Sequence, residues 1–309
     1  MNKKVVRFGV WLIILVSIWL VGNIWLSCIV EKREYLHVIL SYMFLLYSFT
    51  PLFAVLLTQK PNLINFKYRL FFKTLPYKSL FKIISIIAIS YPLIILGLTF
   101  LFGNILNVDL VGSISVDTSR FSGILLSQSP LFRFFILFIV ILLGGLLTGM
   151  TLHFLVVLGG EIAWRGLLER EIRIGNRAKK TVIIGLIWGI WGIIPTVFSR
   201  SLAPFDTAVF IEIALMFGFY IVCSFLCVSI LYKTGTIIGV ALARGLINSF
   251  SLFILMVITP SFSYSVTNNR HLFSIIAVIL IYILINYQHR KHPFIPKENS
   301  IPPGNEGAT

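Results

Sequence analysis

The chain contains few charged residues: Asp, Glu, Lys and Arg together make up 12% of its 309 residues, and only 11 of these residues are acidic. A soluble globular domain carries about twice that charged fraction. Hydrophobic residues make up 58% of the chain, and the mean hydropathy is +0.95. This composition excludes an ordinary soluble domain and predicts an all-α polytopic membrane protein.

Cysteine is also scarce. The three cysteines, Cys28, Cys223 and Cys227, all lie inside apolar segments. An odd count without a nearby cluster of histidines argues against a disulfide framework and against a zinc site. Cys223 and Cys227 share one face of a helix, and we expect them to pack against lipid or within the core. No bound metal or other cofactor is expected.

Eight apolar runs are long enough to cross a hydrocarbon core of about 30 Å, which requires about 20 helical residues. Their expected ranges are 8–30, 36–57, 81–102, 131–158, 181–197, 207–232, 236–257 and 272–288. The chain has no linker rich in Pro, Gly or Ser and no internal repeat. We therefore expect a single membrane domain, and a small-solute transporter is disfavoured.

Basic residues give the chain a net charge of +15, but they form no continuous patch interleaved with aromatic residues. A nucleic-acid partner is therefore not expected. If the N-terminus lies inside, nineteen Lys and Arg residues fall on inward segments and six on outward segments or span mouths. The positive-inside rule thus predicts eight transmembrane helices with both termini in the cytoplasm, the N-in/C-in topology.

This topology divides the chain into four parts. Residues 1–130 contain the first three transmembrane helices and a basic cytoplasmic loop, which suits an anionic membrane surface. Residues 131–257 form the core, and residues 258–288 contain the last transmembrane helix. Residues 289–309 are polar and contain prolines, so we expect a disordered cytoplasmic tail.

Ionisable residues inside apolar runs are the strongest indication of function, because they rarely persist at membrane depth without a partner or a role. Three segments each place two distinctive residues at positions i and i+4, which share one helix face. The pairs are Glu161 and Arg165, Trp188 and Gly192, and Arg244 and Asn248. In a helical bundle we expect these three faces to converge on one polar chamber.

The order and context of these motifs resemble the CPBP family, the CAAX-protease and bacteriocin-processing intramembrane metalloproteases also labelled Abi. The resemblance covers roughly residues 130 to 255. The family motifs are Glu-Glu-x-x-x-Arg, then Phe or Trp-x-x-x-His, then His-x-x-x-Asn or Asp. The flanking residues match at Trp164, Arg165 and Gly166, at Trp188, Gly189, Trp191 and Pro195, and at Gly245 and Asn248.

The residues at the family's catalytic positions differ in this chain. The first Glu of the family's pair falls on Gly160, the second-motif His on Gly192 and the third-motif His on Arg244. The resemblance implies that the lost Glu and the second-motif His activate a water molecule, while the third-motif His and Asn stabilise an oxyanion. Glycine supplies neither a base nor a metal ligand, and a permanently protonated Arg opposes a divalent cation.

Arg244 is expected to fill the space that Gly160 and Gly192 leave. An unpaired Arg inside a membrane bundle costs at least ~2.5 kcal/mol on insertion scales. We therefore expect a buried ion pair, with Glu161 as the favoured partner and Glu212 as the second candidate. Glu212 lies about 9 Å inside the sixth expected span, where it either lines a polar cavity or pairs with an Arg.

His153 precedes Gly160 by two helical turns, about 10 Å along the axis. That distance is too long for a direct replacement of the missing side chain, so we expect an ordinary, hydrogen-bonded helix histidine.

These residues predict a CPBP-like pseudoenzyme in a bacterial plasma membrane. It would bind or regulate a membrane or envelope protein or peptide, or act in bacteriocin self-immunity, with membrane lipid as its surroundings. The alternative is an active CAAX-type endopeptidase, a hydrolase that uses Glu161 and either His153 or Glu212 in altered roles, with zinc as cofactor. The expected site comprises Gly160, Glu161, Arg165, Gly192, Arg244 and Asn248, with Trp164, Trp188, Trp191 and Glu212 as binding residues.

The predicted topology places residues 103–130 outside and residues 165–180 inside. In a variant that lacks the native cysteines, a cysteine introduced at Ser115 should react with a membrane-impermeant maleimide in intact cells. A cysteine introduced at Gly175 is the matched control and should react only after permeabilisation. Labelling at Ser115 only after permeabilisation would overturn the N-in orientation.

Overall fold

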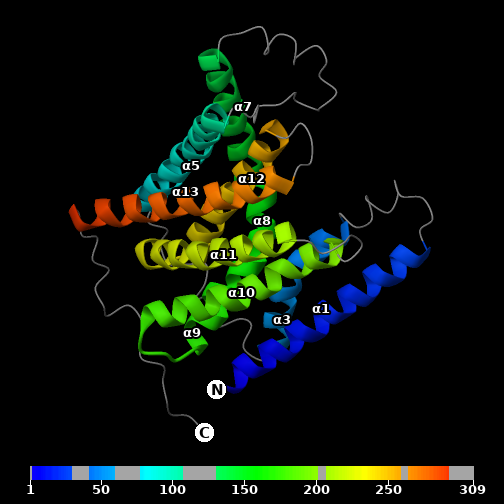
Figure 1. Ribbon diagram of the computed structural model, residues 1–309. Coiled ribbons are helices and arrows are strands. Elements are labelled where there is room, and N and C mark those ends of the chain that lie inside the picture. The colour runs from blue at the N-terminus through cyan, green and yellow to red at the C-terminus, as the bar shows by residue number, and fades with distance from the viewer. Residues whose placement is uncertain are drawn as a thin grey trace.

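The computed structural model describes residues 2–29, 42–59, 77–106, 130–200, 207–258 and 264–291, and nearly all of these residues are helical (Figure 1). The helices are α1 (Lys3–Ile29), α3 (Thr50–Thr58), α5 (Tyr77–Leu106), α7 (Pro130–Met150), α8 (Leu152–Glu161), η2 (Ile162–Leu168), α9 (Glu169–Glu171), α10 (Arg177–Arg200), α11 (Thr207–Thr234), α12 (Ile237–Ile258) and α13 (Tyr264–Lys291). No strand occurs within the described ranges. The predicted all-α class is therefore confirmed for this part of the chain.

Within the described part of the chain, five helices are long and apolar enough to cross a membrane, namely those within Lys3–Leu26, Tyr77–Thr99, Arg177–Phe198, Val209–Thr234 and Ile237–Ile254. Phe138–Met150 and Leu152–Glu171, which meet at a bend of 51°, make a sixth if they form one broken span. The expected spans 36–57 and 272–288 coincide with the shorter apolar helices Tyr42–Thr58 and His271–Tyr287. These helices fit a multi-pass membrane protein.

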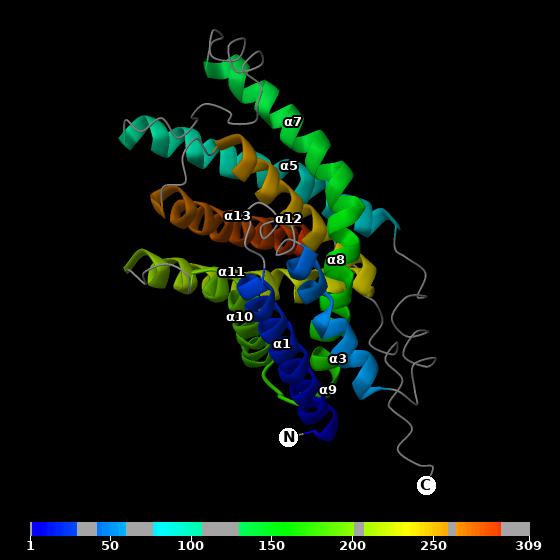
Figure 2. The same cartoon turned by 90° about the vertical axis from the view of Figure 1, so that its right-hand side faces the viewer.

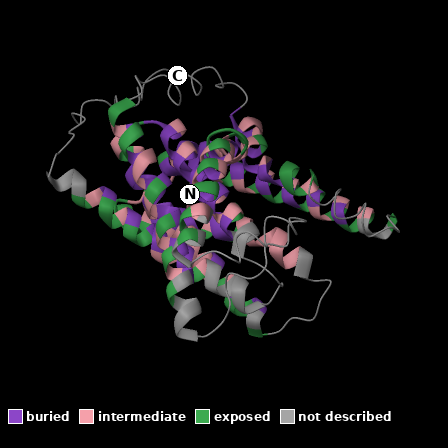
Figure 3. Ribbon diagram, turned by 90° about the horizontal axis from the view of Figure 1, so that it is seen from above, coloured by how far each residue is buried: buried purple, intermediate pink, exposed green. Residues whose placement is uncertain are grey.

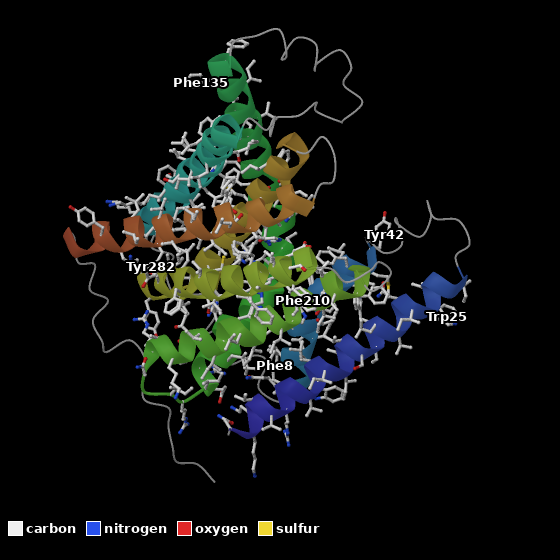
Figure 4. All side chains as sticks on the ribbon, in the orientation of Figure 1. Phe8, Trp25, Tyr42, Phe135, Phe210 and Tyr282 are labelled. Carbon is white, nitrogen blue, oxygen red and sulfur yellow. The ribbon has the colours of Figure 1, made fainter. Side chains whose placement is uncertain are left out.

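Large apolar side chains cover the outer surfaces of the helices. Ile13 is 68% exposed, Leu147 is 70% exposed and Trp25, which projects from α1 in Figure 4, is 63% exposed. Buried residues are concentrated in the middle of the bundle, as Figure 3 shows. Apolar exposure on this scale is unfavourable in water but is matched by lipid tails.

The helices form a stack crossed by a column. In Figure 1, α10, α11, α13 and α5 follow one another, with α11 packed between α10 and α13. Figure 2 shows α7 and α8 as one bent column, and α12 packs against both of them. The segment η2 contacts α3, α10, α11 and α12, so it lies where the stack, the column and the N-terminal helices meet.

Glycines allow α12 to approach the junction of α7 and α8 at backbone distance. A Cβ atom added to Gly245 would stand 2.5 Å from the carbonyl oxygen of Gly149 and 2.9 Å from the amide nitrogen of Phe154. Thr148 and Ser249 form a hydrogen bond across the same helix pair. Small residues permit such close packing of membrane helices. The contact fixes the residues next to Gly245 on α12 against α8.

Gly245→Ala should destabilise the bundle, because the atoms that face the new methyl group belong to the backbone and cannot rotate away. Overpacking of this kind costs ~1–3 kcal/mol, so the midpoint of thermal unfolding in detergent should fall. Gly97→Ala in α5 is the matched control, because nothing lies within 4 Å of its added Cβ atom and alanine has the higher helix propensity. Equal midpoints for the two variants would show that α12 and α8 are not in backbone contact.

Candidate functional site

A cavity of about 530 Å³ lies where all three motif-bearing segments meet. The first motif contributes residues from α8 and η2, the second from α10 and the third from α12. These lining residues are Gly160, Glu161, Trp164, Trp188, Trp191, Arg244 and Asn248. The structure thus brings the distinctive residues of three separate segments to one chamber, apart from Arg165 and Gly192, which do not line it.

Glu161 and Arg165 form a buried ion pair beside this cavity. Nε of Arg165 lies 3.5 Å from Oε2 of Glu161, and the two side chains are 0% and 1% exposed, respectively. Nη2 of Arg165 donates to the hydroxyl of Ser224 at 3.0 Å, and that hydroxyl donates to the carbonyl of Thr181 at 2.9 Å. The carboxylate of Glu161 is therefore neutralised by a residue of its own segment, which is in turn held by α11 and α10.

The ion pair lies at a change of helix type. Glu161 ends α8, and the chain continues as a π-helix from Ile162 to Leu168 in which every residue is buried. A π-helical turn holds more residues than an α-helical turn, and such turns often occur at functional sites. Within this segment Trp164 lines the cavity, whereas Arg165 points to Ser224 instead.

Arg244 lies against an aromatic wall of the cavity. Its guanidinium carbon is 4.6 Å from the ring centroid of Trp188, 5.3 Å from that of Phe219 and 5.9 Å from that of Tyr220. Nη1 lies 3.9 Å from Sγ of Cys223, and Nε has no hydrogen-bond partner among the described residues. Cation–π contact stabilises the charge of a desolvated guanidinium by ~2 kcal/mol.

The expected ion pair between Arg244 and Glu161 is therefore wrong. Within the described ranges, no nitrogen of Arg244 lies within 4.0 Å of a carboxylate oxygen, and the carboxylate of Glu161 pairs with Arg165. Two physical reasons account for the difference. First, Arg165 lies one helical turn from Glu161 on the same segment and pairs with it. Second, the aromatic rings around Arg244 stabilise its charge, a role that the sequence analysis assigned to a carboxylate.

Gly160 and Gly192 do not leave one shared space for Arg244 to fill. A Cβ atom added to Gly192 would overlap the ring of Tyr220. A Cβ atom added to Gly160 would stand 3.2 Å from Nε1 of Trp164. The expectation that Arg244 occupies the space at both glycines is therefore wrong at Gly192, where Tyr220 occupies it.

The remaining expected residues fall in different places. His153 lines the cavity together with Glu161, whereas Glu212 is buried on α11 and does not line it. Cys223 and Cys227 are buried free thiols, so of the two expected environments, lipid and core, they occupy the core. The side chain of Cys28 lies outside the described part of the chain.

A row of aromatic side chains connects the cavity with α1. Trp191 lies 5.7 Å from Trp164 and stacks on Tyr47 at 4.9 Å and 7°. Tyr47 in turn lies 4.6 Å from Trp19 of α1. Nε1 of Trp191 donates to the hydroxyl of Thr50 at 3.0 Å, and the hydroxyl of Tyr47 donates to the carbonyl of Trp191. The first helix, which carries no motif, therefore helps to hold the position of Trp191.

Hydroxyl groups connect the opposite side of the cavity to α5. Ser251 and Ser274 line the cavity, and the hydroxyl of Tyr91 lies 2.6 Å from Oγ of Ser251 and donates to Ser274 at 3.1 Å. This network joins α5, α12 and α13.

The donor set of the cavity does not fit the zinc ion that the alternative function implies. Among the described residues, no three His, Cys, Asp or Glu side chains gather closely enough to hold a metal ion. Glu161 is paired with Arg165, which lies beside the cavity, and Arg244 places a fixed cation in the cavity itself. Two guanidinium groups disfavour a divalent cation at this place.

Sequence patterns do not identify Tyr47, Phe219, Tyr220 and Ser224 as site residues. Phe219, Tyr220 and Ser224 lie in an apolar run of α11 without polar periodicity, and Tyr47 lies in a segment without a motif. Their roles depend on how α11 and the helix before α3 face α10 and α12, and no local pattern encodes that packing. The one available signal is the tyrosine hydroxyl itself, which needs a partner when it is buried.

The chain matches no protein-family model, no curated protein and no solved structure. The functional conclusion therefore depends on the geometry of the cavity and on the motifs themselves.

The buried pair should be detectable by a double-mutant cycle. Removal of one partner of a buried ion pair costs ~3–5 kcal/mol, because it leaves an isolated charge. Glu161→Gln and Arg165→Gln should each lower the unfolding midpoint in detergent, and the double variant should recover much of that loss.

The matched control is the cycle of Glu161→Gln with Arg244→Gln. This double variant should recover less, because no direct contact joins the two side chains. Strictly additive losses in the first cycle would show that Glu161 and Arg165 are not paired.

Proposed function

We propose that the protein is a catalytically inactive, CPBP-like protein of a bacterial plasma membrane that binds a membrane or envelope polypeptide. Its eight apolar segments would all cross the membrane, with both termini in the cytoplasm. The order of the three motifs in the sequence supports the family assignment. The position of those motifs around one cavity supports a common binding site.

Arg244 is the observation that carries this proposal. A guanidinium has five donors, and the described partner of Arg244 is a cysteine sulfur, which is a weak acceptor. Buried donors without acceptors cost free energy until an acceptor reaches them. A backbone carbonyl or a C-terminal carboxylate of a bound polypeptide would supply that acceptor. A bidentate carboxylate is the stronger partner for a guanidinium.

The walls of the cavity suit a short peptide segment. Trp164, Trp188 and Trp191 offer aromatic faces to apolar side chains, and Ser48, Ser251 and Ser274 offer hydroxyl groups to the peptide backbone. A volume of about 530 Å³ lies within the range of about 300–1,000 Å³ that is typical of ligand sites. The occupant would therefore be a chain terminus or a loop of the partner, rather than a folded domain.

Binding without cleavage follows from the chemistry of the same residues. Hydrolysis needs a base or a metal that activates water. Gly160 and Gly192 provide neither, and the carboxylate of Glu161 is occupied by Arg165. Arg244 can donate a hydrogen bond to a peptide oxygen, but it stays protonated and cannot act as the base. A polypeptide retained in this way suits a regulator of an envelope protein or a self-immunity protein that holds a bacteriocin.

An active endopeptidase is the second candidate function. The observation in its favour is that His153 and Glu161 line the same cavity, which places an imidazole and a carboxylate within one chamber. In that case His153 would act as the base.

Site-directed photo-cross-linking in native membranes tests the binding function. A photoreactive amino acid in place of Leu252, which lines the cavity and is 37% exposed, should form an adduct with a polypeptide partner. Ile190 is the matched control, because it is 56% exposed and does not line the cavity. Arg244→Ala should abolish the adduct at Leu252 without lowering expression. An adduct that survives Arg244→Ala would contradict the proposed site.

A cleavage assay separates the two candidate functions. The purified protein should leave the captured polypeptide and prenylated or leader peptides intact, and it should bind no stoichiometric zinc. Cleavage that Glu161→Gln abolishes would instead establish the endopeptidase.

A further inference from the structure

A second cavity, of about 440 Å³, lies where the start of α10, the end of α11 and the last turns of α13 meet. None of its lining residues belongs to the first cavity. Its polar lining includes Arg177, Thr181, Ser229, Lys233 and Asn286. The function proposed above uses none of these side chains, so the second cavity requires a separate explanation.

Arg177 and Lys233 give this cavity two positive charges that no carboxylate of the described residues balances. Neither side chain has a carboxylate oxygen within 4.0 Å in the described part of the chain. The carboxylates of the segment that precedes α10, Glu169 and Glu171, form ion pairs with other basic residues. The lining of the cavity itself contains no acidic residue. An anionic ligand would therefore supply the negative charge that these two cations need.

Neighbouring groups hold both cations in place. The guanidinium carbon of Arg177 lies 3.4 Å from the ring centroid of Tyr232. Nζ of Lys233 donates to the carbonyl of Ile285 at 2.7 Å and to Oδ1 of Asn286 at 2.9 Å. An ammonium has three donors, so Lys233 keeps one for a ligand, and Arg177 keeps the donors on the edge of its guanidinium. Cations that are already oriented lose less side-chain entropy on binding.

The cavity combines these cations with an apolar surface at the ends of helices. α10 begins at Arg177 and α11 ends one residue after Lys233, so both charges lie where the helices leave the apolar layer. Phe225 and Tyr282 extend the lining along α11 and α13, with ring centroids 6.4 Å apart. Figure 4 shows Tyr282 on the part of α13 that runs beside α11. A ligand with an anionic head and an apolar tail matches both parts of this lining.

We propose that the second cavity binds the phosphodiester headgroup of an anionic phospholipid. Arg177 and Lys233 contact the phosphate oxygens, and the second amide hydrogen of Asn286 adds a hydrogen bond. The hydroxyl of Ser229 donates to Oδ1 of Asn286 and so holds that amide in place. The first part of the acyl chains lies against Phe225 and Tyr282 of the cavity lining. Basic pockets between transmembrane helices recognise lipid headgroups in this way. A zwitterionic choline lipid binds less well, because its own ammonium group meets the same two cations.

The test uses the full-length protein in phosphatidylcholine nanodiscs, with phosphatidylglycerol added in increasing fractions. Native mass spectrometry counts the retained lipids, and thermal unfolding reports stabilisation. Phosphatidylglycerol should bind the unsubstituted protein and raise its unfolding midpoint. Arg177→Ala and Lys233→Met should each weaken binding about fivefold, which corresponds to about 1 kcal/mol for each basic residue. The double variant should lose at least about tenfold.

Lys179→Ala is the matched control, because it removes a positive charge from the same turn of α10 but not from the cavity lining. Its affinity for phosphatidylglycerol should not change. Arg177→Ala should not impair folding, since Arg177 is exposed at the start of its helix. The unfolding midpoint of this variant in pure phosphatidylcholine should therefore equal that of the unsubstituted protein. Equal phosphatidylglycerol binding by all variants, or equal binding of the two lipids, would overturn the proposal. Saturation by inorganic phosphate or glycerol phosphate, without retention of lipid, would show a site for soluble anions instead.

Discussion

Every charge buried among the helices needs a partner within a few ångströms, and the interior of this protein is organised around that requirement. Glu161, Arg165 and Arg244 are each about 95% buried or more. Glu161 and Arg165 form an ion pair, and Nη2 of Arg165 joins the hydroxyl of Ser224, which donates to the carbonyl of Thr181. Oε2 of Glu161 and Nε and Nη1 of Arg165 form no hydrogen bond among the described residues. Arg244 is left with aromatic faces and a sulfur atom. Two arginines within one small volume are therefore stabilised differently, one by a carboxylate and the other by aromatic rings.

The sequence predicts the class of the fold and the convergence of its motifs, because both depend on strong local signals. Long apolar runs are a requirement of the bilayer, and residues spaced at i and i+4 must share a helix face. The structure describes five or six helices that satisfy the length and apolarity of a span. It also places Glu161, Trp188, Arg244 and Asn248 at one cavity. The apolar helices Tyr42–Thr58 and His271–Tyr287 are shorter than the other spans, and composition alone did not predict that difference in length.

The partners within the site could not be predicted, because they depend on how helices from distant parts of the chain pack. The sequence shows that Arg244 needs stabilisation, but it does not show that Phe219 and Tyr220 of α11 provide it. The π-helix after Glu161 could not be predicted either, since no residue pattern in Ile162–Leu168 distinguishes a π-helical from an α-helical turn. Backbone contact between Gly149 and Gly245, together with that change of helix type, determines which residues of α8 and α12 face the cavity.

The contact between Gly192 and Tyr220 limits which residues position 192 can accept. While the ring of Tyr220 keeps its place, position 192 has no room for any side chain. A single substitution that introduced a histidine there would therefore meet a filled space, and the ring would first have to shrink or turn away. A functional side chain at position 192 would thus require changes at two residues on different helices. Substitutions at positions 192 and 220 are therefore coupled across two helices, and a side chain can be accommodated at the first only after the second has changed.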